Sequence, residues 1–448
     1  MYIDRIAYDK LKDWKNSKHR KPLLIRGARQ VGKTTLIRKF AQEFSDYIEL
    51  SLEKKTERTL FERTDEPDKL LSSIYLLKQK SPGKTPTLLF IDEIQESPKA
   101  IHMLRYFYEE RPELFVIAAG SLLEFALRKV PSFPVGRINY LTLHPLNFPE
   151  FLGVRNPGAY KALVEIPVPE YAHQILIDLF HEYAIVGGMP EIISMYKENE
   201  NLASLSPVYK QLWQSYKDDV EKYARNPTDR KVIRHIIDTA PKETDRIKFE
   251  GFGNSAYRSR EVGEALRALD LARIILLNYP TTNIAPPVMA NLKKRPRLQF
   301  VDTGLITNSL MLQGEMIGIN DLNDFYRGKI IQHLIGQELI SIQDDTGYRP
   351  HFWIREEKNS NAEVDYVYQY RKHVIPAEVK SGKQGSLRSL HQFIERTRHP
   401  YAVRFYQGEF RIEKAKTPGG KPYILMNLPY YLGTQINKYV AYLVENNP

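Results

Sequence analysis

The stretch PLLIRGARQVGKTTLIRKF, residues 22–40, constrains the fold more than any other part of the chain. It contains the pattern G-x-x-x-x-G-K-[ST] between a strand-like apolar run and a helical pattern, which is the context of a phosphate-binding loop. The glycines allow backbone N–H groups to curl around a phosphate, and the helix N-terminus adds a partial positive charge. The stretch therefore predicts a nucleotide-binding α/β domain.

The same loop predicts ATP and Mg²⁺ as cofactors. We expect Lys33 to reach the β and γ phosphates and the Thr34 hydroxyl to bind Mg²⁺. The residues predicted to bind the nucleotide are Gly27, Ala28, Arg29, Gln30, Val31, Gly32, Lys33, Thr34 and Thr35.

An acidic counterpart to this loop stands in TLLFIDEIQ, residues 87–95. Its continuous apolar run is typical of an interior parallel strand. Asp92 then falls at the carboxyl end of the strand, where ligands bind in such sheets, and we expect it to hold Mg²⁺ through water. Glu93 is expected to orient or deprotonate the attacking water. The pair predicts an NTP hydrolase rather than a protein that only binds nucleotide.

Two more residues are candidates for the hydrolytic site. The strand pattern ELFVIAAGS ends at Ser121, a small polar residue that could contact the γ-phosphate or the water; a simple strand-end turn is the alternative. Arg137 precedes the next strand pattern and is the arginine best placed to neutralise charge in the transition state. A surface arginine explains that position equally well.

The middle of the chain changes from helical to mixed patterns. Residues 156–245 have apolar side chains at three- and four-residue spacing, which predicts a helical lid or linker. Residues 246–310 contain a helix pattern, an apolar strand, a Pro-rich loop and a second strand, an order that indicates a winged helix. We expect a basic wing that contacts phosphates, with a solvated hairpin or a connector to the neighbouring domain as alternatives. Its cations are Lys293, Lys294, Arg295 and Arg297.

Residues 311–448 follow the order helix, strands, helix, which is that of a restriction-endonuclease-like α/β domain. Alternate residues of a strand share a face. Asp365 therefore lies on the same face as Glu363, and Glu378 lies on the same face as Lys380. If the two strands pair, these faces can converge.

The convergent side chains would make a second Mg²⁺ site. Asp365 and Glu378 are predicted to bind the metal, which would activate water and stabilise a pentavalent phosphate. Lys380 would supply positive charge beside the reacting oxygens. Glu338, on the preceding helix, could complete the metal shell, and Gln392 could orient Lys380 or the water. The alternative is a solvated hairpin, because Glu and Lys two residues apart also form an ordinary ion pair.

Composition limits the possible partners and locations. The formal net charge of +11 favours nucleic acid and then anionic membranes as partners, although a soluble protein that is simply basic has the same charge. The absence of cysteine excludes disulfides, zinc knuckles and thiol chemistry. No secretory pattern opens the chain and no apolar run approaches the ~18 residues of a membrane helix. A cytoplasmic location without membrane contact is therefore expected.

Several of these stretches together resemble a large prokaryotic family of AAA-type ATPases with a C-terminal domain of unknown function. The similar stretches are GARQVGKTT, LLFIDEIQ, AAGS, the GR at 136–137, LHPLNFPEF, YAIVGGMPE, DTGL, and the E-V-D and E-V-K signatures. The resemblance covers most of the chain. It places Ser121 at the first sensor position and implies a winged helix and a PD-(D/E)XK nuclease-like C-terminal domain. Val364 stands where the nuclease pattern has proline, and many relatives with this fold bind without cutting.

The sequence thus predicts four domains: a P-loop ASCE or AAA-like ATPase domain at 1–155, a helical lid at 156–245, a winged helix at 246–310 and a nuclease-like domain at 311–448. We expect Mg²⁺-dependent ATP hydrolysis coupled to DNA or RNA contact by the basic C-terminal half. The alternative is an ATP-dependent molecular switch whose C-terminal domain is a catalytically inactive protein-interaction module. A homo-oligomer or a protein partner is compatible with both.

Overall fold

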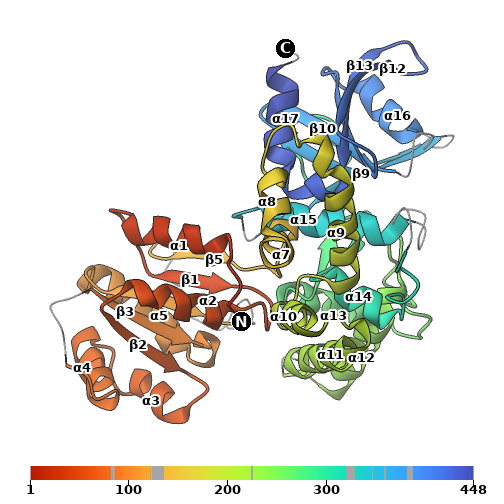
Figure 1. Cartoon of the computed structure of the whole chain (residues 1–448). Helices are drawn as coiled ribbons and strands as arrows, with labels where there is room; N and C mark the ends of the chain where they lie inside the picture. The colour runs from red at the N-terminus through yellow and green to blue at the C-terminus, as the bar shows by residue number, and fades with distance from the viewer. Residues whose placement is uncertain are drawn as a thin grey trace. The chain divides into compact units, whose positions relative to one another are not determined.

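The computed structural model divides into two compact units (Figure 1). Unit 1 comprises Met1–Pro145, Leu271–Ile274 and Asp344–Thr346, and unit 2 comprises Leu146–Asp270, Ile275–Gln343 and Gly347–Pro448. The structure describes residues 2–81, 86–121, 123, 136–222, 224, 226–318, 328–345, 347–357, 360–380 and 387–446. Across these ranges, no helix combines the length and the apolar composition that crossing a bilayer requires.

Unit 1 is built on a parallel five-stranded sheet. Its strands are β1 (Leu23–Arg26), β2 (Asp46–Ser51), β3 (Thr87–Asp92), β4 (Phe115–Ala119) and β5 (Asn139–Thr142), and their order in space is β2-β3-β4-β1-β5. Strand β4 therefore lies between β1, which leads into the phosphate loop, and β3, which carries the acidic pair. This parallel sheet confirms the α/β fold expected for the first part of the chain.

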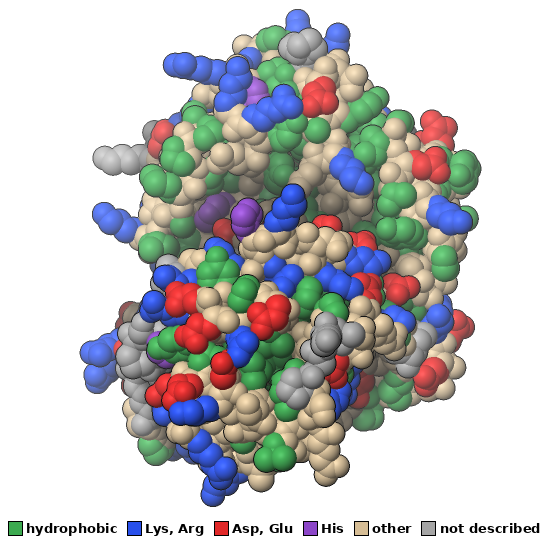
Figure 2. All heavy atoms as spheres, turned by 90° about the vertical axis from the view of Figure 1, so that its left-hand side faces the viewer, with side chains coloured by type: hydrophobic (Ala, Val, Ile, Leu, Met, Phe, Trp, Pro, Cys, Tyr) green, Lys and Arg blue, Asp and Glu red, His purple; other side chains and the backbone are tan. Residues whose placement is uncertain are grey.

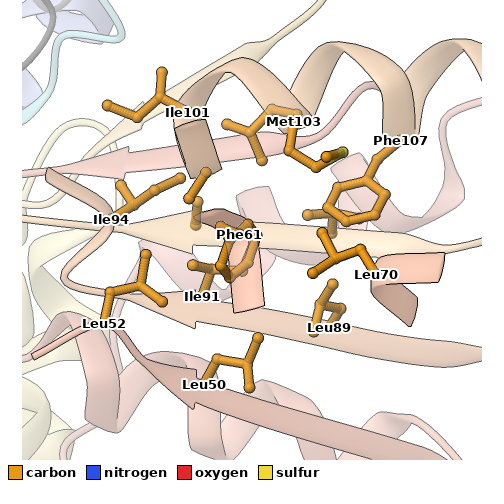
Figure 3. Packing of buried hydrophobic residues seen from close by; sticks show 14 of the residues in the cluster. Leu50, Leu52, Phe61, Leu70, Leu89, Ile91, Ile94, Ile101, Met103 and Phe107 are labelled. Atoms are coloured by element: carbon orange, nitrogen blue, oxygen red, sulfur yellow. The ribbon is translucent and has the colours of Figure 1, made fainter. Parts of the chain in front are cut away.

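Helices pack on the sheet through side chains that the sequence pattern places on one face. They are α1 (Ala7–Asn16), α2 (Lys33–Phe40), α3 (Lys55–Arg63), α4 (Pro67–Leu77) and α5 (Pro98–Glu110). In Figure 3, Phe61 of α3, Leu70 of α4 and Phe107 of α5 meet Leu89 and Ile91 of β3 in one buried cluster. Fully burying an aliphatic or aromatic side chain contributes about 1.5–3 kcal/mol. This cluster fixes the strand whose end carries the acidic pair.

The first part of unit 2 is helical. Its helices are α7 (Phe148–Arg155), α8 (Pro157–Leu163), α9 (His173–Val186), α10 (Pro190–Asn199), α11 (Ser206–Glu221) and α12 (Pro227–Thr239). A capping box starts α7: the Asn147 side chain accepts from the Glu150 N–H, and the Glu150 carboxylate accepts from the Asn147 N–H. The boundary between the units falls before Leu146, whereas the sequence analysis places the first boundary after residue 155.

A helix and a short hairpin follow. Helix α13 (Ser259–Leu271) precedes strands β6 (Ile275–Asn278) and β7 (Arg297–Phe300), which pair antiparallel, and α14 (Thr303–Ser309) comes next. The helix and the two strands lie in the order that the winged-helix prediction requires. That prediction itself stays a prediction, because a helix and a two-stranded hairpin occur in many folds.

The last part of unit 2 is a six-stranded mixed sheet with helices. The elements are α15 (Lys329–Ser341), β8 (His351–Glu357), β9 (Ser360–Tyr370), β10 (His373–Val379), α16 (Arg388–Arg396), β11 (Tyr401–Tyr406), β12 (Arg411–Lys416), β13 (Pro422–Pro429) and α17 (Ile436–Glu445). The strand order is β12-β13-β11-β10-β9-β8, with β10 antiparallel to β9 and parallel to β11. Strands β9 and β10 are therefore neighbours, as the convergence of their polar faces requires.

Three of the conspicuous motifs meet inside unit 2. The Leu146 N–H donates to the Gly188 carbonyl at 2.7 Å, and the Gly188 N–H donates to Asp302 Oδ2 at 2.5 Å. A Cβ on Gly187 would lie 2.3 Å from Asp302 Oδ1, and a Cβ on Gly304 would lie 2.3 Å from the Val186 carbonyl oxygen. The stretches LHPLNF, YAIVGG and DTGL therefore hold one another in the core, and their glycines are required by close packing.

Candidate functional site

The phosphate loop joins β1 to α2 through a tightly constrained backbone. Gly32 has φ +92°, and Gly27 has φ +150°. A Cβ on Gly27 would lie only 2.2 Å from the carbonyl oxygen of Leu143, in the segment that follows β5. Both positions therefore need glycine for conformational and steric reasons.

Lys33 lies inside this loop. Its side chain is buried, and Nζ donates to the carbonyl oxygens of Gly27 at 3.1 Å and Ala28 at 2.8 Å. Arg5 connects the loop to the segment after β5. Its guanidinium donates to the carbonyl oxygens of Val31 at 2.9 Å and His144 at 2.6 Å. The sequence analysis missed Arg5, because a single buried arginine near the N-terminus carries no motif.

Thr34 and Asp92 meet at the carboxyl edge of the sheet. The Thr34 hydroxyl donates to Asp92 Oδ2 at 2.8 Å, and Asp92 Oδ1 accepts from the Glu93 N–H at 3.0 Å. Burial raises the pKa of the Asp92 carboxyl, with the charge of Glu93 adding to the effect. A hydroxyl and a carboxylate at this distance are the hard oxygen ligands that Mg²⁺ prefers. The two residues therefore fit the metal predicted from the sequence.

Glu93 is held beside the end of β4 by a residue that the sequence analysis did not select. Gln95 Nε2 donates to Glu93 Oε2, and a Cβ on Gly120 would lie 2.2 Å from Gln95 Oε1. Gln95 Oε1 is buried and has no hydrogen-bond partner within the described part of the chain. Ser121, also buried, directly follows Gly120. The carboxylate of Glu93 thus lies on the side of the sheet edge where Ser121 is placed.

Arg137 lies at the other edge of the sheet. It precedes β5, which runs parallel to β1, so Arg137 is at the amino ends of the strands while the phosphate loop is at their carboxyl ends. Its guanidinium pairs with Glu109 near the C-terminal end of α5. The structure therefore does not bring Arg137 to the nucleotide loop of its own chain, because strand polarity, which the motif spacing alone does not reveal, separates them.

In unit 2 the structure brings three predicted residues together. Asp365 Oδ1 accepts from Gln332 Nε2 at 2.6 Å, and Oδ2 accepts from the Val379 N–H at 2.9 Å. Glu378 Oε1 pairs with Lys380 Nζ at 3.0 Å. Burial and the nearby charge of Asp365 raise the pKa of the Glu378 carboxyl to about 8. Side chains of β9 and β10 therefore lie close together, and their role as a metal or catalytic site stays a prediction.

Glu338 does not join this group, which corrects the prediction that it completes a metal shell. Its fully buried carboxylate accepts from the Phe148 N–H at 3.2 and 3.1 Å and from the Tyr183 hydroxyl at 3.0 Å. Burial raises the pKa of the Glu338 carboxyl to about 8. The α15 residue that reaches Asp365 is Gln332. Gln392 accepts a hydrogen bond from Arg355 at 3.0 Å, and its expected role beside Lys380 stays a prediction.

Asp365 and Glu378 do not by themselves provide a three-ligand metal site. Within the ranges that the structure describes, no group of three or more His, Cys, Asp or Glu side chains is arranged to hold a metal ion. Both oxygens of Asp365 and Oε1 of Glu378 already have protein partners. The guanidinium of Arg297 lies 3.6 Å from Asp365 Oδ1, which adds a positive charge to that of Lys380. The arrangement of this group therefore does not by itself support a metal-dependent step.

Two of the four predicted wing cations face the C-terminal sheet. Arg297 pairs with Glu363, and Lys294 pairs with Glu356 at 2.5 Å. Arg246 joins both carboxylates, at 2.5 Å to Glu356 and 3.2 Å to Glu363. For Lys294 and Arg297 the structure thus shows a connector between the hairpin and the C-terminal strands, which was one of the alternatives.

Comparisons with known proteins agree with this geometry in unit 1. Residues 19–152 match the family model of an AAA domain, and residues 177–315 and 327–430 match two domains of unknown function, DUF8612 and DUF4143. No curated protein matches the chain. The AAA match supports an AAA-type ATPase domain in this part of the chain, in agreement with the parallel sheet and the phosphate loop of unit 1.

Several solved structures are similar to parts of the chain at low sequence identity. A Walker-type ATPase of Pyrococcus abyssi has a TM-score of 0.45 and 15% identity, over 69% of this chain and 96% of its own. The Orc1 protein of Aeropyrum pernix in complex with DNA has a TM-score of 0.28 and 13% identity, over 69% and 92%. The RuvB Holliday junction branch migration motor of Thermotoga maritima has a TM-score of 0.27 and 15% identity, over 65% of this chain and 93% of its own.

Proposed function

We propose that this chain binds MgATP in the loop between β1 and α2 and hydrolyses it with Glu93 as the base. The observation that carries the proposal is the contact of Thr34 with Asp92 at 2.8 Å, because it joins the loop motif to the acidic strand at one point. Lys33 then leaves the loop carbonyls and contacts the β and γ phosphates. Ser121, at the end of the strand between β1 and β3, orients the γ-phosphate or the water.

The chain's own residues determine how the metal would act. Thr34 and Asp92 would hold Mg²⁺, which when bound supplies charge neutralisation at the β and γ phosphate oxygens. Gln95 holds the Glu93 carboxylate in place through its hydrogen bond. A glutamate fixed in this way can take a proton from an attacking water. Arg137 receives no role in the site of its own chain, because it lies at the opposite edge of the sheet.

For unit 2 we propose contact with DNA or RNA that responds to the nucleotide state of unit 1. The net charge of +11, which belongs to the whole chain and not to unit 2 alone, supports a polyanionic partner. On the face drawn in Figure 2, many Lys and Arg side chains are exposed, and Asp and Glu side chains lie among them in the lower part of the view.

Contact without cleavage is the form of this proposal that the geometry supports best. Asp365 accepts from Gln332 and Val379, Glu378 pairs with Lys380, and Glu338 lies elsewhere in the core. Cleavage remains the second candidate because of one observation: Glu378 Oε2 is buried beside Asp365 and has no hydrogen-bond partner among the residues described. An unpartnered carboxylate oxygen of this kind is a possible metal ligand.

Incubation of labelled duplex and single-stranded DNA and RNA with the wild-type chain and Mg²⁺ separates the two candidates. We expect the wild-type chain to bind nucleic acid without cleaving it. The nucleic acid should therefore stay intact with the wild type and with Asp365→Asn and Glu378→Gln alike. Cleavage by the wild type that both variants lose, and that the neighbouring Glu363→Gln control retains, would establish the second candidate and contradict the first. Absence of binding at low salt would contradict the nucleic-acid proposal itself and favour a protein-interaction module.

A further inference from the structure

The long connection between β6 and β7 has a base that is fixed on the C-terminal sheet. The Thr281 N–H donates to the Phe352 carbonyl at 2.8 Å, and the Ile354 N–H donates to the Thr281 carbonyl at 3.0 Å, so the connection extends the edge of β8. Ile284 and Val288 pack against the buried cluster around Trp353. The base is therefore part of the folded core of unit 2.

The tip of the same connection is ordered by its own hydrogen bonds. The Asn291 N–H donates to the Pro280 carbonyl at 2.7 Å, which ties the two sides of the connection together. The Lys294 N–H donates to the Asn291 carbonyl at 3.1 Å, and the Lys293 N–H donates to Asn291 Oδ1 at 3.2 Å. Asn291 therefore forms a turn that fixes the backbone on both sides of it.

This ordered tip exposes apolar side chains. Met289 is 60% exposed and Leu292 is 71% exposed. Two large apolar side chains within four residues of an otherwise polar turn gain nothing from folding of the chain alone. Exposed apolar side chains that are held in place and rimmed by polar residues commonly mark an interaction site.

The cations of the basic stretch divide into two pairs with different surroundings. Lys294 and Arg297 are paired with carboxylates of the C-terminal sheet, Glu356 and Glu363. Lys293 and Arg295 are exposed, and neither has an ion-pair or hydrogen-bond partner for its side chain in the described ranges. Lys293 directly follows the exposed Leu292 in the chain and Arg295 lies three residues after it, so exposed positive charge and exposed apolar surface occur in the same short segment.

We propose that this tip, formed by Met289, Leu292, Lys293 and Arg295, is a contact site for duplex nucleic acid. The two cations contact backbone phosphates, and the two apolar side chains lie against sugars and base edges in a groove. The tip combines the phosphate contacts that position a protein on a duplex with the apolar side chains that groove-binding proteins use. A membrane surface would require a larger apolar face than two side chains provide.

The inference rests on the proposed nucleic-acid partner and adds where that partner is held. Its test is the salt dependence of binding, because each phosphate contact contributes about 0.9 to the slope of log K against log salt concentration on B-DNA. Fluorescence anisotropy of a labelled duplex, recorded in EDTA so that no cutting occurs, gives this slope. For a Lys293→Gln, Arg295→Gln double variant we expect the slope to fall in magnitude by about 1.8, which is two contacts.

Two single variants make the test specific. Leu292→Ser is expected to weaken binding roughly fivefold without changing the slope, because it removes apolar contact and no charge. Lys294→Gln is the matched control: it removes the same charge from the same stretch, but this lysine is already paired with Glu356, so the slope should stay at the wild-type value. A melting curve of each variant shows that unit 2 is folded in the binding experiment.

The outcomes distinguish this inference from the function on which it rests. A double variant that binds with the wild-type slope and affinity would overturn the tip assignment while leaving nucleic-acid binding intact. A slope lowered equally by Lys294→Gln would also overturn it, since the charge would then act without regard to where it points. A wild-type chain that binds no duplex at low salt, but binds vesicles containing phosphatidylserine through the tip, would overturn both in favour of a membrane contact.

Discussion

A Glu93→Gln variant is expected to bind MgATP with near wild-type affinity and to hydrolyse it about 10²–10⁴-fold more slowly. The amide has the shape of the carboxylate but cannot accept a proton from water. The residues proposed to hold the nucleotide, Lys33, Thr34 and Asp92, are unchanged, and Thr34 keeps its contact with Asp92. Phosphate release and the binding of a fluorescent ATP analogue, measured on the same preparation, give the two quantities.

The neighbouring Glu96 provides the control. Its carboxylate forms a partly exposed ion pair with Arg58 at 3.5 Å and lies three residues beyond the proposed base. Glu96→Gln should therefore leave the hydrolysis rate unchanged. If Glu93→Gln keeps the wild-type rate, the proton acceptor is another group and the role given to Glu93 is wrong.

The second large effect concerns the core of unit 2. Gly187→Ala is expected to lower the free energy of unfolding of unit 2 by more than about 3 kcal/mol, because strained backbone and overpacking each cost about 1–3 kcal/mol. Gly187 has φ +76°, and the new Cβ would lie 2.3 Å from Asp302 Oδ1 and 2.7 Å from the Gly304 nitrogen. Urea unfolding monitored by the tryptophan fluorescence of unit 2 measures the change.

Gly153 offers a matched substitution. It lies within α7, and a Cβ there would meet nothing within 4 Å. Gly153→Ala should therefore stabilise the protein by about 0.5–1 kcal/mol, the difference in helix propensity. A Gly187→Ala variant as stable as the wild type would show that the Gly-Gly motif is not required by packing against Asp302.

Local pattern was sufficient to predict the nucleotide module. The loop needs a glycine at 27 and then glycine, lysine and threonine in consecutive positions at 32–34, and four apolar residues, 88–91, precede Asp92 in its strand. Each of these signals lies within one strand–loop–helix segment, so no long-range information is needed to recognise it. The pairing of β9 with β10 was likewise predictable, because the two strands are separated by a short turn.

The unsuccessful predictions depend on partners far away in the sequence. Helical periodicity places Glu338 on one face of α15, but the groups that it meets, Phe148 and Tyr183, lie about 190 and 155 residues earlier. The partner of Lys294 is Glu356, 62 residues later. Sequence spacing therefore could not separate the paired cations of this stretch from those unpaired within the described residues. Gln332 is uncharged, so nothing in the sequence distinguishes it as the α15 residue that contacts Asp365.

Three other motifs also depend on residues far away in the sequence, and their residue types alone indicate no chemistry. LHPLNF, YAIVGG and DTGL lie up to about 160 residues apart, yet their backbones and Asp302 meet in one buried cluster. Burial raises the pKa of the Asp302 carboxyl to about 6, and its oxygens accept from backbone N–H groups. The three motifs share close packing in the core of unit 2. Close packing explains their conspicuous residues without a role in binding or catalysis.

The most direct test of the account is ATP turnover by the purified full-length chain, with Lys33→Ala and Lys39→Ala measured beside it. Lys33 lies in the phosphate loop, whereas Lys39 lies at the other end of the same helix. We predict Mg²⁺-dependent phosphate release by the wild type and by Lys39→Ala, and loss of at least 100-fold in Lys33→Ala, in line with removal of a transition-state contact. Equal turnover in all three proteins would contradict the assignment of this loop as the site of hydrolysis.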